Sequence, residues 1–363
     1  MKKSRTTGSG PRTGLHASQS GELALLARIC DRIAAAGRGA GIRLGVGDDC
    51  ALIALKAGEE IAVTTDLSIA GRHFELDWHP PEAIGHRVLA RGLSDLASMG
   101  ARPVAAFLSL GIPKELAGGS GRGRSANRAA TRGWLDRFYD GLLALAGEFK
   151  TPLAGGDLAE SPIAVADIVA LGAARRGRAL LRSGARPGDA IYATGSLGGA
   201  AAGLILLTEF AKTRRGTAPT GLRIPKRLGP ALARHLYPQP RIRQGLILAR
   251  RRLATAAIDI SDGLSTDLRH LCEESNVAAE IDADALPVSP DATLAQALHG
   301  GEDYELLFTA RPDANLPRAI AGVVITRIGR VVKRSAKKPI VTLVSTAGGR
   351  EALESKGWEH FSQ

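Results

Sequence analysis

Acidic residues interrupt this chain at six separated places, each bounded by glycine, serine or threonine and each beside an apolar run. They are Asp48–Asp49, Asp66, Asp95, Asp157, Asp259–Asp262 and Glu302–Asp303. A single exposed aspartate is usually a solvated surface charge, but six such places are hard to explain in that way. Carboxylates gathered from several element ends supply the hard oxygen ligands that Mg²⁺ prefers. The pattern therefore predicts a metal-dependent nucleotide site.

The length and the order of elements predict two domains that mix strands and helices. A chain of 363 residues exceeds one ordinary core, since a domain typically holds about 150 residues. Strand-like and helix-like runs alternate in both halves, which favours an α/β or α+β fold over an all-β fold. Basic and turn-forming residues over 173–187 indicate the boundary. We expect a disordered basic tail over 1–20, an N-terminal nucleotide- and metal-binding domain over 21–172, and a C-terminal domain over 173–363.

Apolar periodicity predicts where individual elements lie. The expected elements are helices over 21–36, 81–100 and 134–149, a strand over 103–112, two strands within 151–172 joined by a turn at Gly155–Gly156, and a last strand over 323–332.

Composition argues against several classes of protein. The chain has no run of about 18 apolar residues, so no membrane span is expected. Cys30, Cys50 and Cys272 are odd in number and form no C-x-x-C pair, which argues against a zinc site and favours a reducing compartment. The basic N-terminal segment lacks the apolar stretch of a secretory signal, so we expect a cytoplasmic protein.

The net charge of +12 raises the alternative of a nucleic-acid-binding protein. Many basic residues fall in the tail and in two stretches, 117–130 and 211–227, with no aromatic residues interleaved for base stacking. Solvated loops are the favoured interpretation. Salt-dependent retention on DNA without ATP turnover would favour the alternative.

The first acidic motifs combine carboxylates with other oxygen donors. Thr64 and Thr65 place hydroxyl and carbonyl oxygens next to Asp66, a combination suited to Mg²⁺. The neighbouring Asp48 and Asp49 face different ways along an extended segment, so at most one of them is expected to be a ligand.

Asp95 is the single residue that most strongly indicates a functional site. Helical spacing from Ile84 and Val88 places it on an apolar stripe, where a carboxylate is expected to be buried. A buried charge needs a metal, an arginine or a shifted pKa. Arg91, one turn earlier, is the alternative partner.

Two further motifs place aspartates where phosphate could bind. Asp157 follows the pair Gly155–Gly156, where backbone N–H groups can approach an anion. Asp259 and Ser261 face the same side of a strand, and Asp262 then starts a helix. Asp262 alone would be an ordinary N-cap, but Asp259 beside it favours metal and phosphate binding.

Familiar phosphate-binding motifs are missing from the sequence. It contains no Walker A motif, no kinase H-R-D or D-F-G, and no G-x-S-x-G. Metal ions, glycine-rich backbone and arginines such as Arg182 would therefore neutralise the phosphates. His73, after Gly71 and Arg72, is a candidate phosphate contact, with a structural histidine as the alternative.

Eight segments, in order along the chain, resemble the thiamine-monophosphate kinase family within the aminoimidazole ribonucleotide synthetase superfamily. They are GVGDDCAL, TTDLSIAGRHF, GLSDLASMGARP, GGDLAESP, LLRSGARPGDAIYATGSLG, DISDGLSTDL, GGEDYELLFT and GWEHF. Each alone is weak, but eight in order are very specific. The resemblance implies phosphorylation of thiamine monophosphate by ATP, by direct in-line transfer on several Mg²⁺ ions.

The resemblance also implies roles for individual residues. Metal ligands would be Asp49, Thr64, Thr65, Asp66, Asp95, Asp157, Asp259 and Asp262, of which Asp95, Asp157 and Asp259 would be catalytic. Tyr139, Gly156, Asp157, Arg182 and Ser261 would contact ATP. His73, Glu302 and Trp358 would contact thiamine monophosphate, where a carboxylate and an aromatic ring suit a cationic thiazolium. A homodimer with paired N-terminal sheets and a C-terminal α/β domain is implied as well.

The sequence departs from the family pattern at a few positions. Leu158 stands where threonine is common, and Gly92 replaces an asparagine. The stretches 117–130 and 211–222 resemble insertions. The alternative within the superfamily is a synthetase that activates a carbonyl or amide oxygen. For selenophosphate synthesis we would expect a reactive cysteine in a glycine-rich loop, whereas Cys30 lies in a predicted helix.

Overall fold

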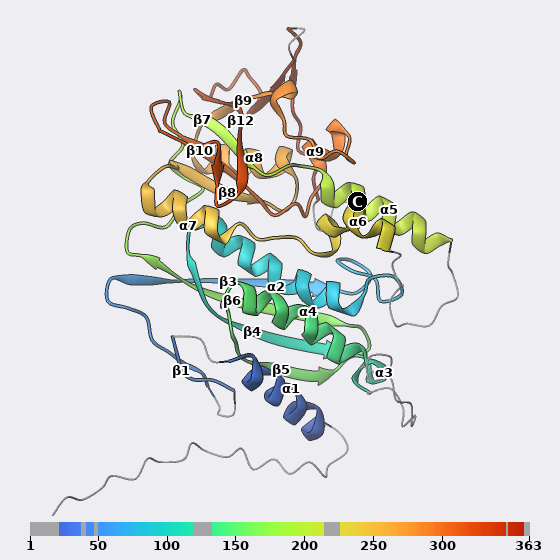
Figure 1. Cartoon of the computed structure of the whole chain (residues 1–363). Coiled ribbons are helices and arrows are strands. Elements are labelled where there is room, and N and C mark those ends of the chain that lie inside the picture. Colours follow the sequence, from blue (N-terminus) through green and yellow to red (C-terminus); the bar gives the residue numbers. More distant parts are fainter. Residues whose placement is uncertain are drawn as a thin grey trace, which may run out of the picture.

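Two β-sheets with their helices form the two halves of the protein (Figure 1). The computed structural model describes residues 22–37, 41–46, 50–118, 133–213, 226–345 and 348–358. Several predicted features lie outside the described residues: the tail over 1–20, most of both basic stretches, and Asp49.

Within the described ranges, the N-terminal half contains α1 (Glu22–Ala36), β1 (Ile42–Leu44), β2 (Leu52–Ile53), β3 (Glu59–Ile69), α2 (Pro81–Ser98), β4 (Arg102–Ile112), α3 (Lys114–Ala117), α4 (Trp134–Glu148), β5 (Leu153–Glu160) and β6 (Val165–Arg175). Its main sheet has the order β3-β6-β4-β5, with β4 and β5 parallel and the other pairs antiparallel. Strands β1 and β2 pair separately.

The described C-terminal half contains β7 (Ala190–Thr194), α5 (Gly199–Lys212), α6 (Gly229–Leu236), α7 (Ile242–Arg251), β8 (Ala256–Ile260), α8 (Leu264–Glu274), β9 (Ala278–Asp282), α9 (Leu294–His299), β10 (Glu305–Ala310), β11 (Ala319–Ile320), β12 (Val323–Val332), β13 (Val341–Val344) and β14 (Arg350–Ala352). Its sheet has the order β14-β13-β9-β12-β7-β10-β8, and β11 pairs with β12. The alternation of strands and helices in both halves confirms the predicted fold class. The predicted boundary at 172/173 stays a prediction.

Helix α2 lies between the two halves and is buried on almost every side (Figure 1). It packs on β3, β6 and α4 of its own half and on α7 and β8 of the other. Glycines allow close approach at its crossings. A Cβ on Gly141 of α4 would meet the Glu82 carbonyl oxygen at 1.8 Å, and one on Gly245 of α7 would meet the Ala97 carbonyl oxygen at 1.9 Å. Both helices therefore need glycine to pack against α2 as they do.

Helices α1, α2 and α4 and strand β4 end within two residues of their predicted bounds, but three local expectations are wrong. The pair 155–156 forms no turn, because β5 runs through it. Gly156, with φ +151°, lies against β4, where a Cβ would meet the Leu108 carbonyl oxygen at 2.0 Å. Helix α8 has its N-cap at Gly263 rather than at Asp262. Strand β12 is not the last, since β13 and β14 follow it.

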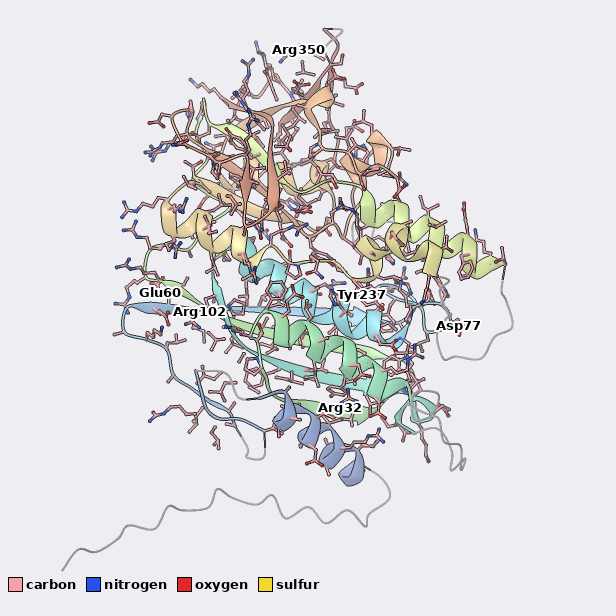
Figure 2. The ribbon with its side chains drawn as sticks, viewed as in Figure 1. Arg32, Glu60, Asp77, Arg102, Tyr237 and Arg350 are labelled. Atoms are coloured by element: carbon pink, nitrogen blue, oxygen red, sulfur yellow. The ribbon has the colours of Figure 1, made fainter. Side chains whose placement is uncertain are left out.

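Several basic side chains pair with acidic partners. Arg102, at the start of β4, pairs with Glu59 at 3.1 Å, and Arg350, at the start of β14, pairs with Glu280; both arginines are labelled in Figure 2. Part of the positive charge is therefore compensated locally. Among the described residues, no helix combines the length and the apolar character needed to cross a membrane.

The close crossing of α2 and α4 predicts an asymmetric response to two glycine substitutions in α4. Gly141→Ala should destabilise the fold by about 1–3 kcal/mol, because its methyl group would overlap the Glu82 carbonyl. Gly147→Ala is the matched control, since nothing lies within 4 Å of its Cβ position and alanine favours the helix. Denaturant unfolding monitored by circular dichroism measures both. Equal stability of the two variants would contradict the described crossing.

Candidate active site

A cavity of about 410 Å³ lies between the two halves. It is lined from the N-terminal half by α2, the end of β3 and the segment that follows it, and from the C-terminal half by α5, α6 and the segments after β8 and before β10. Eight residues predicted from the sequence line it: Asp66, His73, Asp95, Asp259, Ser261, Asp262, Glu302 and Trp358. The structure thus brings together residues from both halves.

Asp95 and Asp259 form a repelling pair of carboxylates in this cavity. Asp259, at the end of β8, is buried, and it accepts a hydrogen bond from Ser94 Oγ at 2.6 Å. Burial, followed by the charge of Asp95, raises the pKa of Asp259 to about 7. Burial also raises the pKa of Asp95, although a 2.5 Å hydrogen bond from Thr64 Oγ1 opposes this. The positive charge of Arg182 partly opposes the rise in both pKa values, so this predicted ATP contact lies near the pair.

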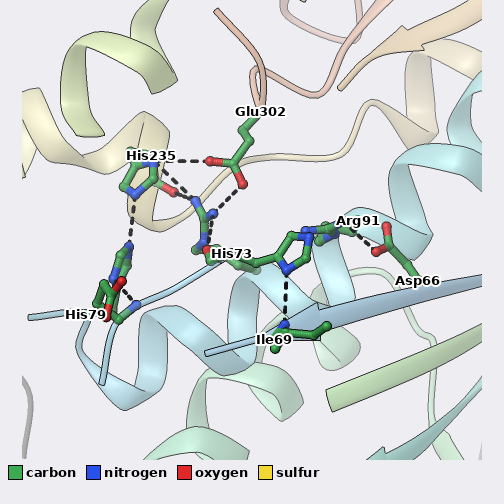
Figure 3. Close-up of polar contacts among 9 residues, drawn as sticks. Asp66, Ile69, His73, His79, Arg91, His235 and Glu302 are labelled. Atoms are coloured by element: carbon green, nitrogen blue, oxygen red, sulfur yellow. Dashed lines mark hydrogen bonds and ion pairs between the residues drawn. The ribbon is translucent and has the colours of Figure 1, made fainter. Parts of the chain in front are cut away.

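The burial expected for Asp95 is only partial. Its side chain lines the cavity and stays partly exposed. The alternative partner proposed from the sequence, Arg91, pairs instead with Asp66, through Nη2 and Oδ1 at 2.6 Å (Figure 3). Asp95 therefore has the Thr64 hydroxyl as its hydrogen-bond donor and lies open to a cation that enters the cavity.

The chemistry of these donors fits Mg²⁺. Among the described residues, no group of three or more histidine, cysteine, aspartate or glutamate side chains forms a ready metal cage. Mg²⁺ usually takes one or two carboxylates and completes its shell with water and substrate phosphates. Asp95, Asp259 and the Thr64 hydroxyl offer such a partial set, and a divalent cation would relieve the repulsion that raises the carboxyl pKa values.

Four described residues of the predicted set lie away from the cavity. Thr65 is exposed on the opposite face of β3 from Thr64. Gly156 and Asp157 are exposed on β5, at the sheet edge. Tyr139 is buried in α4, with its ring 5.7 Å from that of Phe138. Their predicted roles stay predictions.

The backbone around Glu302 is strained and held on several sides. Glu302 and Tyr304 both have positive φ, +69° and +50°, which non-glycine residues rarely adopt. The Glu302 N–H donates to the Ser261 carbonyl oxygen at 2.8 Å. Between them, Asp303 accepts hydrogen bonds from the N–H groups of Gly198 and Ala200 at the start of α5. These contacts fix the strained segment at the cavity wall.

The Glu302 side chain contacts a buried polar cluster that the sequence analysis missed (Figure 3). Arg87 of α2 donates to Glu302 Oε1 at 2.5 Å. His235 of α6 places Nδ1 3.6 Å from Glu302 Oε2, and His79 lies behind it, with Nε2 3.0 Å from His235 Nε2. The sequence feature that points to Arg87 is its spacing: it stands one helical turn before Arg91 on the same buried helix.

Burial keeps the two histidines neutral. It lowers the pKa of His79 to about 3, helped by the positive charge of Arg87. Burial and Arg87 lower the pKa of His235 in the same way. Both rings are therefore uncharged near neutral pH, and Arg87 is the cation that balances Glu302.

Aromatic and apolar side chains form another part of the cavity wall. Phe74, Trp78 and Leu204 line it together with Trp358. Trp358 is half exposed, and its backbone N–H donates to the Asp262 carbonyl oxygen at 3.0 Å. The cavity thus combines a carboxylate side with an aromatic side, which suits a ligand that carries both phosphate and a flat ring.

Comparison with known families matches both halves of the chain. Residues 47–178 match the AIR synthase related protein, N-terminal domain, and residues 186–342 match the corresponding C-terminal domain. The thiamine-monophosphate kinase of Escherichia coli K12 is 38% identical over 356 residues, covering 94% of this chain and 98% of the relative. The enzyme of the same name from Bacillus subtilis 168 is 32% identical, covering 88% and 94%.

Solved structures agree with these matches. Thiamine-monophosphate kinase from Stenotrophomonas maltophilia K279a superposes with a TM-score of 0.71 at 36% identity, covering 87% of this chain and 95% of that one. The structure described as AaThiL complexed with AMPPCP and TMP gives a TM-score of 0.67 at 27% identity, covering 94% and 97%. The hydrogenase maturation protein HypE in complex with ATP, at 17% identity and a TM-score of 0.66, shares the fold.

The repelling carboxylates predict that Asp259→Asn stabilises the metal-free protein. The amide keeps an oxygen that can accept from Ser94, and it removes a buried charge. The free energy of unfolding at pH 8 in EDTA should therefore be about 1–3 kcal/mol higher for the variant than for wild type. The same variant should lose the rise in unfolding temperature that Mg²⁺ with an ATP analogue gives to wild type.

The control for this experiment is Asp282→Asn, an exposed capping residue that accepts a hydrogen bond from the Asp284 N–H. It should respond to Mg²⁺ and the analogue as wild type does. If Asp259→Asn kept the full response to Mg²⁺ and the analogue, Asp259 would not be a metal ligand.

Proposed function

This chain belongs to the thiamine-monophosphate kinases of the AIR synthase related family, and we propose that it transfers the γ-phosphoryl group of ATP to thiamine monophosphate, giving thiamine diphosphate and ADP. The observation that carries the proposal is one cavity that joins Asp95 and Asp259 with Glu302 and Trp358. The similarity to the thiamine-monophosphate kinases spans nearly the whole of both chains.

The carboxylate side of the cavity holds the phosphates together with metal. We propose that Asp95 and Asp259 hold Mg²⁺, while Thr64 and Ser94 orient them through their hydroxyl groups. Mg²⁺ held by these residues would offset the negative charge of the phosphates. Arg182 adds a positive charge on the same side.

The transfer needs positioning more than acid–base catalysis. An oxygen of the thiamine monophosphate phosphate attacks the γ-phosphorus, and the bond from that phosphorus to the β,γ-bridging oxygen breaks as ADP leaves. The attacking oxygen is already nucleophilic, so the protein's work is alignment and electrostatic stabilisation.

We propose that the substrate side is formed by His73, Glu302 and Trp358. His73 lines the cavity, and its Nδ1 accepts the Ile69 N–H at 3.1 Å, so a neutral ring carries its proton on Nε2 (Figure 3). Glu302 and Trp358 suit the cationic thiazolium ring. The other assignments kept as proposals are metal ligation by Asp49, Thr65, Asp66, Asp157 and Asp262 and ATP contacts by Tyr139, Gly156, Asp157 and Ser261.

The function is tested by incubating purified protein with ATP, Mg²⁺ and either thiamine or thiamine monophosphate, and separating the thiamine species. Thiamine diphosphate should form only from the monophosphate and only with metal. Asp95→Asn should lower kcat by at least ~10²-fold, because it removes a proposed metal ligand. ATP binding without any thiamine diphosphate would favour a sister synthetase that acts on a carbonyl or amide oxygen.

We also propose that the protein is a cytoplasmic homodimer formed through the outer face of the N-terminal sheet. Ile61, Val63 and Leu67 on β3 are 50%, 58% and 47% exposed, which is unusual for three large apolar residues on one strand face. A two-fold pairing of this face would bury all three.

Charge on that face should dissociate the dimer. The double variant Val63→Glu, Leu67→Glu should elute as a monomer in size-exclusion chromatography with light scattering, while wild type gives twice the 37.8 kDa chain mass. Val324→Glu, at an equally exposed position on β12 of the other half, should leave the mass unchanged. A monomeric wild type, or a dimeric double variant, would rule out this interface.

A further inference from the structure

We propose that Arg91 is a substrate-binding residue, which holds the phosphate of thiamine monophosphate between the metal side and the substrate side of the cavity. The inference rests on the proposed function for the identity of that phosphate. Arg91 lines the cavity from α2, and its side chain is only 16% exposed, so its charge lies in a fixed and largely dry part of the wall.

A phosphate that enters this cavity needs a positive charge to bind. Among the described residues that line it, the charged side chains are mostly carboxylates, and the arginines are Arg72 and Arg91. Arg72 is exposed in the segment after β3. Arg91 is held by the ion pair between its Nη2 and Asp66 Oδ1 at 2.6 Å (Figure 3). Arg91 is therefore the cation whose position at this wall is already set before a ligand binds.

The neighbouring Arg87 is less suited to this role, because its donors are already used. Its Nη1 donates to the His235 carbonyl oxygen, and its Nη2 donates to the His73 carbonyl oxygen and to Glu302 Oε1. Among the described residues, Arg91 makes no hydrogen bond through Nη1, while its Nε is buried without an acceptor. A guanidinium carries five N–H groups, so Arg91 keeps donors for a ligand after its one ion pair.

Arg91 also lies between the two sides of the cavity. It stands one helical turn before Asp95. Burial raises the pKa of Asp95, and Arg91 is among the positive charges that oppose this rise. Burial by itself would lower the pKa of Arg91, but Tyr304, Asp66 and Glu302 raise it. A phosphate bound at Arg91 would therefore lie near metal held by Asp95 while the thiazolium ring lies near Glu302.

This position would make the site selective for the phosphorylated form of the substrate. Thiamine has the same ring as thiamine monophosphate but no phosphate, so it would leave the donors of Arg91 unused. Hydrogen bonds between a guanidinium and a phosphate are stronger than bonds between neutral groups. Because Asp66 orients the guanidinium in advance, less conformational entropy is lost when the phosphate binds.

The substitution Arg91→Gln tests the proposal by removing the charge. KM for thiamine monophosphate should rise by about 10–100-fold, because a charge-assisted hydrogen bond is lost. KM for ATP should stay within about twofold of wild type. Arg91→Lys should lose less, since it keeps the charge without the planar fork. An unchanged KM for thiamine monophosphate, or an equal rise in KM for ATP, would overturn the proposal.

Thiamine distinguishes a contact with the phosphate from a contact with the ring. As a competitive inhibitor, it should have an inhibition constant in Arg91→Gln within about twofold of that in wild type, because it has no phosphate to lose. An inhibition constant that rises together with KM for thiamine monophosphate would show that Arg91 acts on the ring.

A double variant addresses the Asp66 carboxylate, which Arg91→Gln leaves without its cation and which by itself would repel phosphate. Asp66→Asn combined with Arg91→Gln removes both charges and keeps the net charge of the cavity. KM for thiamine monophosphate should remain raised in this variant. A return to the wild-type KM would mean that Arg91 only neutralises Asp66.

Arg137→Gln controls for the loss of an ion pair on α2. Arg137 of α4 pairs through Nε with Glu82 Oε1 at 2.7 Å, and neither residue lines the cavity. This variant should lower the unfolding temperature at most, and an equal rise in KM would show that loosening α2 suffices. The wild-type assay separates the two proposals: a wild type that makes no thiamine diphosphate refutes the proposed function, whereas an active wild type matched in KM by Arg91→Gln refutes the role of Arg91.

Discussion

Buried charge on α2 is the constraint on which the arrangement of the two halves depends. Arg87, Arg91 and Asp95 follow one another at intervals of one helical turn on a helix that is covered on almost every side. A buried charge without a partner costs several kcal/mol, which applies above all to Arg87, since Arg91 and Asp95 are partly exposed. Arg87 reaches Glu302 in the C-terminal half, Arg91 reaches Asp66 on β3, and Asp95 faces the cavity. Charge compensation therefore specifies how the halves fit together as well as what lies between them.

The carboxylates that line the cavity are of two electrostatic kinds. Asp95 and Asp259 repel each other, and their raised pKa values express a free-energy cost that a divalent cation would reverse. Glu302 is already balanced by Arg87 and is held by its surroundings. Asp95 and Asp259 favour the binding of a metal ion with its phosphates, while Glu302 offers a negatively charged group whose position is already fixed.

Much of this site could be predicted from the sequence, because acidic residues at element ends are visible there. Asp95 and Asp259 were expected to share a site, and they do share a cavity although they lie on α2 and β8. The contact of Arg87 with Glu302 could not be predicted in the same way, since it joins residues 215 positions apart and depends on how the halves pack. The sequence predicts a turn at Gly155–Gly156, because a pair of glycines by itself does not distinguish a turn from a close contact between strands.

Trp358 has a consequence for the order in which the site is completed during synthesis. The cavity is lined by residues from Asp66 to Trp358, and the backbone N–H of Trp358 is anchored on the Asp262 carbonyl oxygen. The N-terminal half can fold while the ribosome is still translating the second, since domains generally fold as units during synthesis. The C-terminal half supplies Asp259, Glu302 and Trp358, so the cavity can be completed only after that half has been translated as far as residue 358.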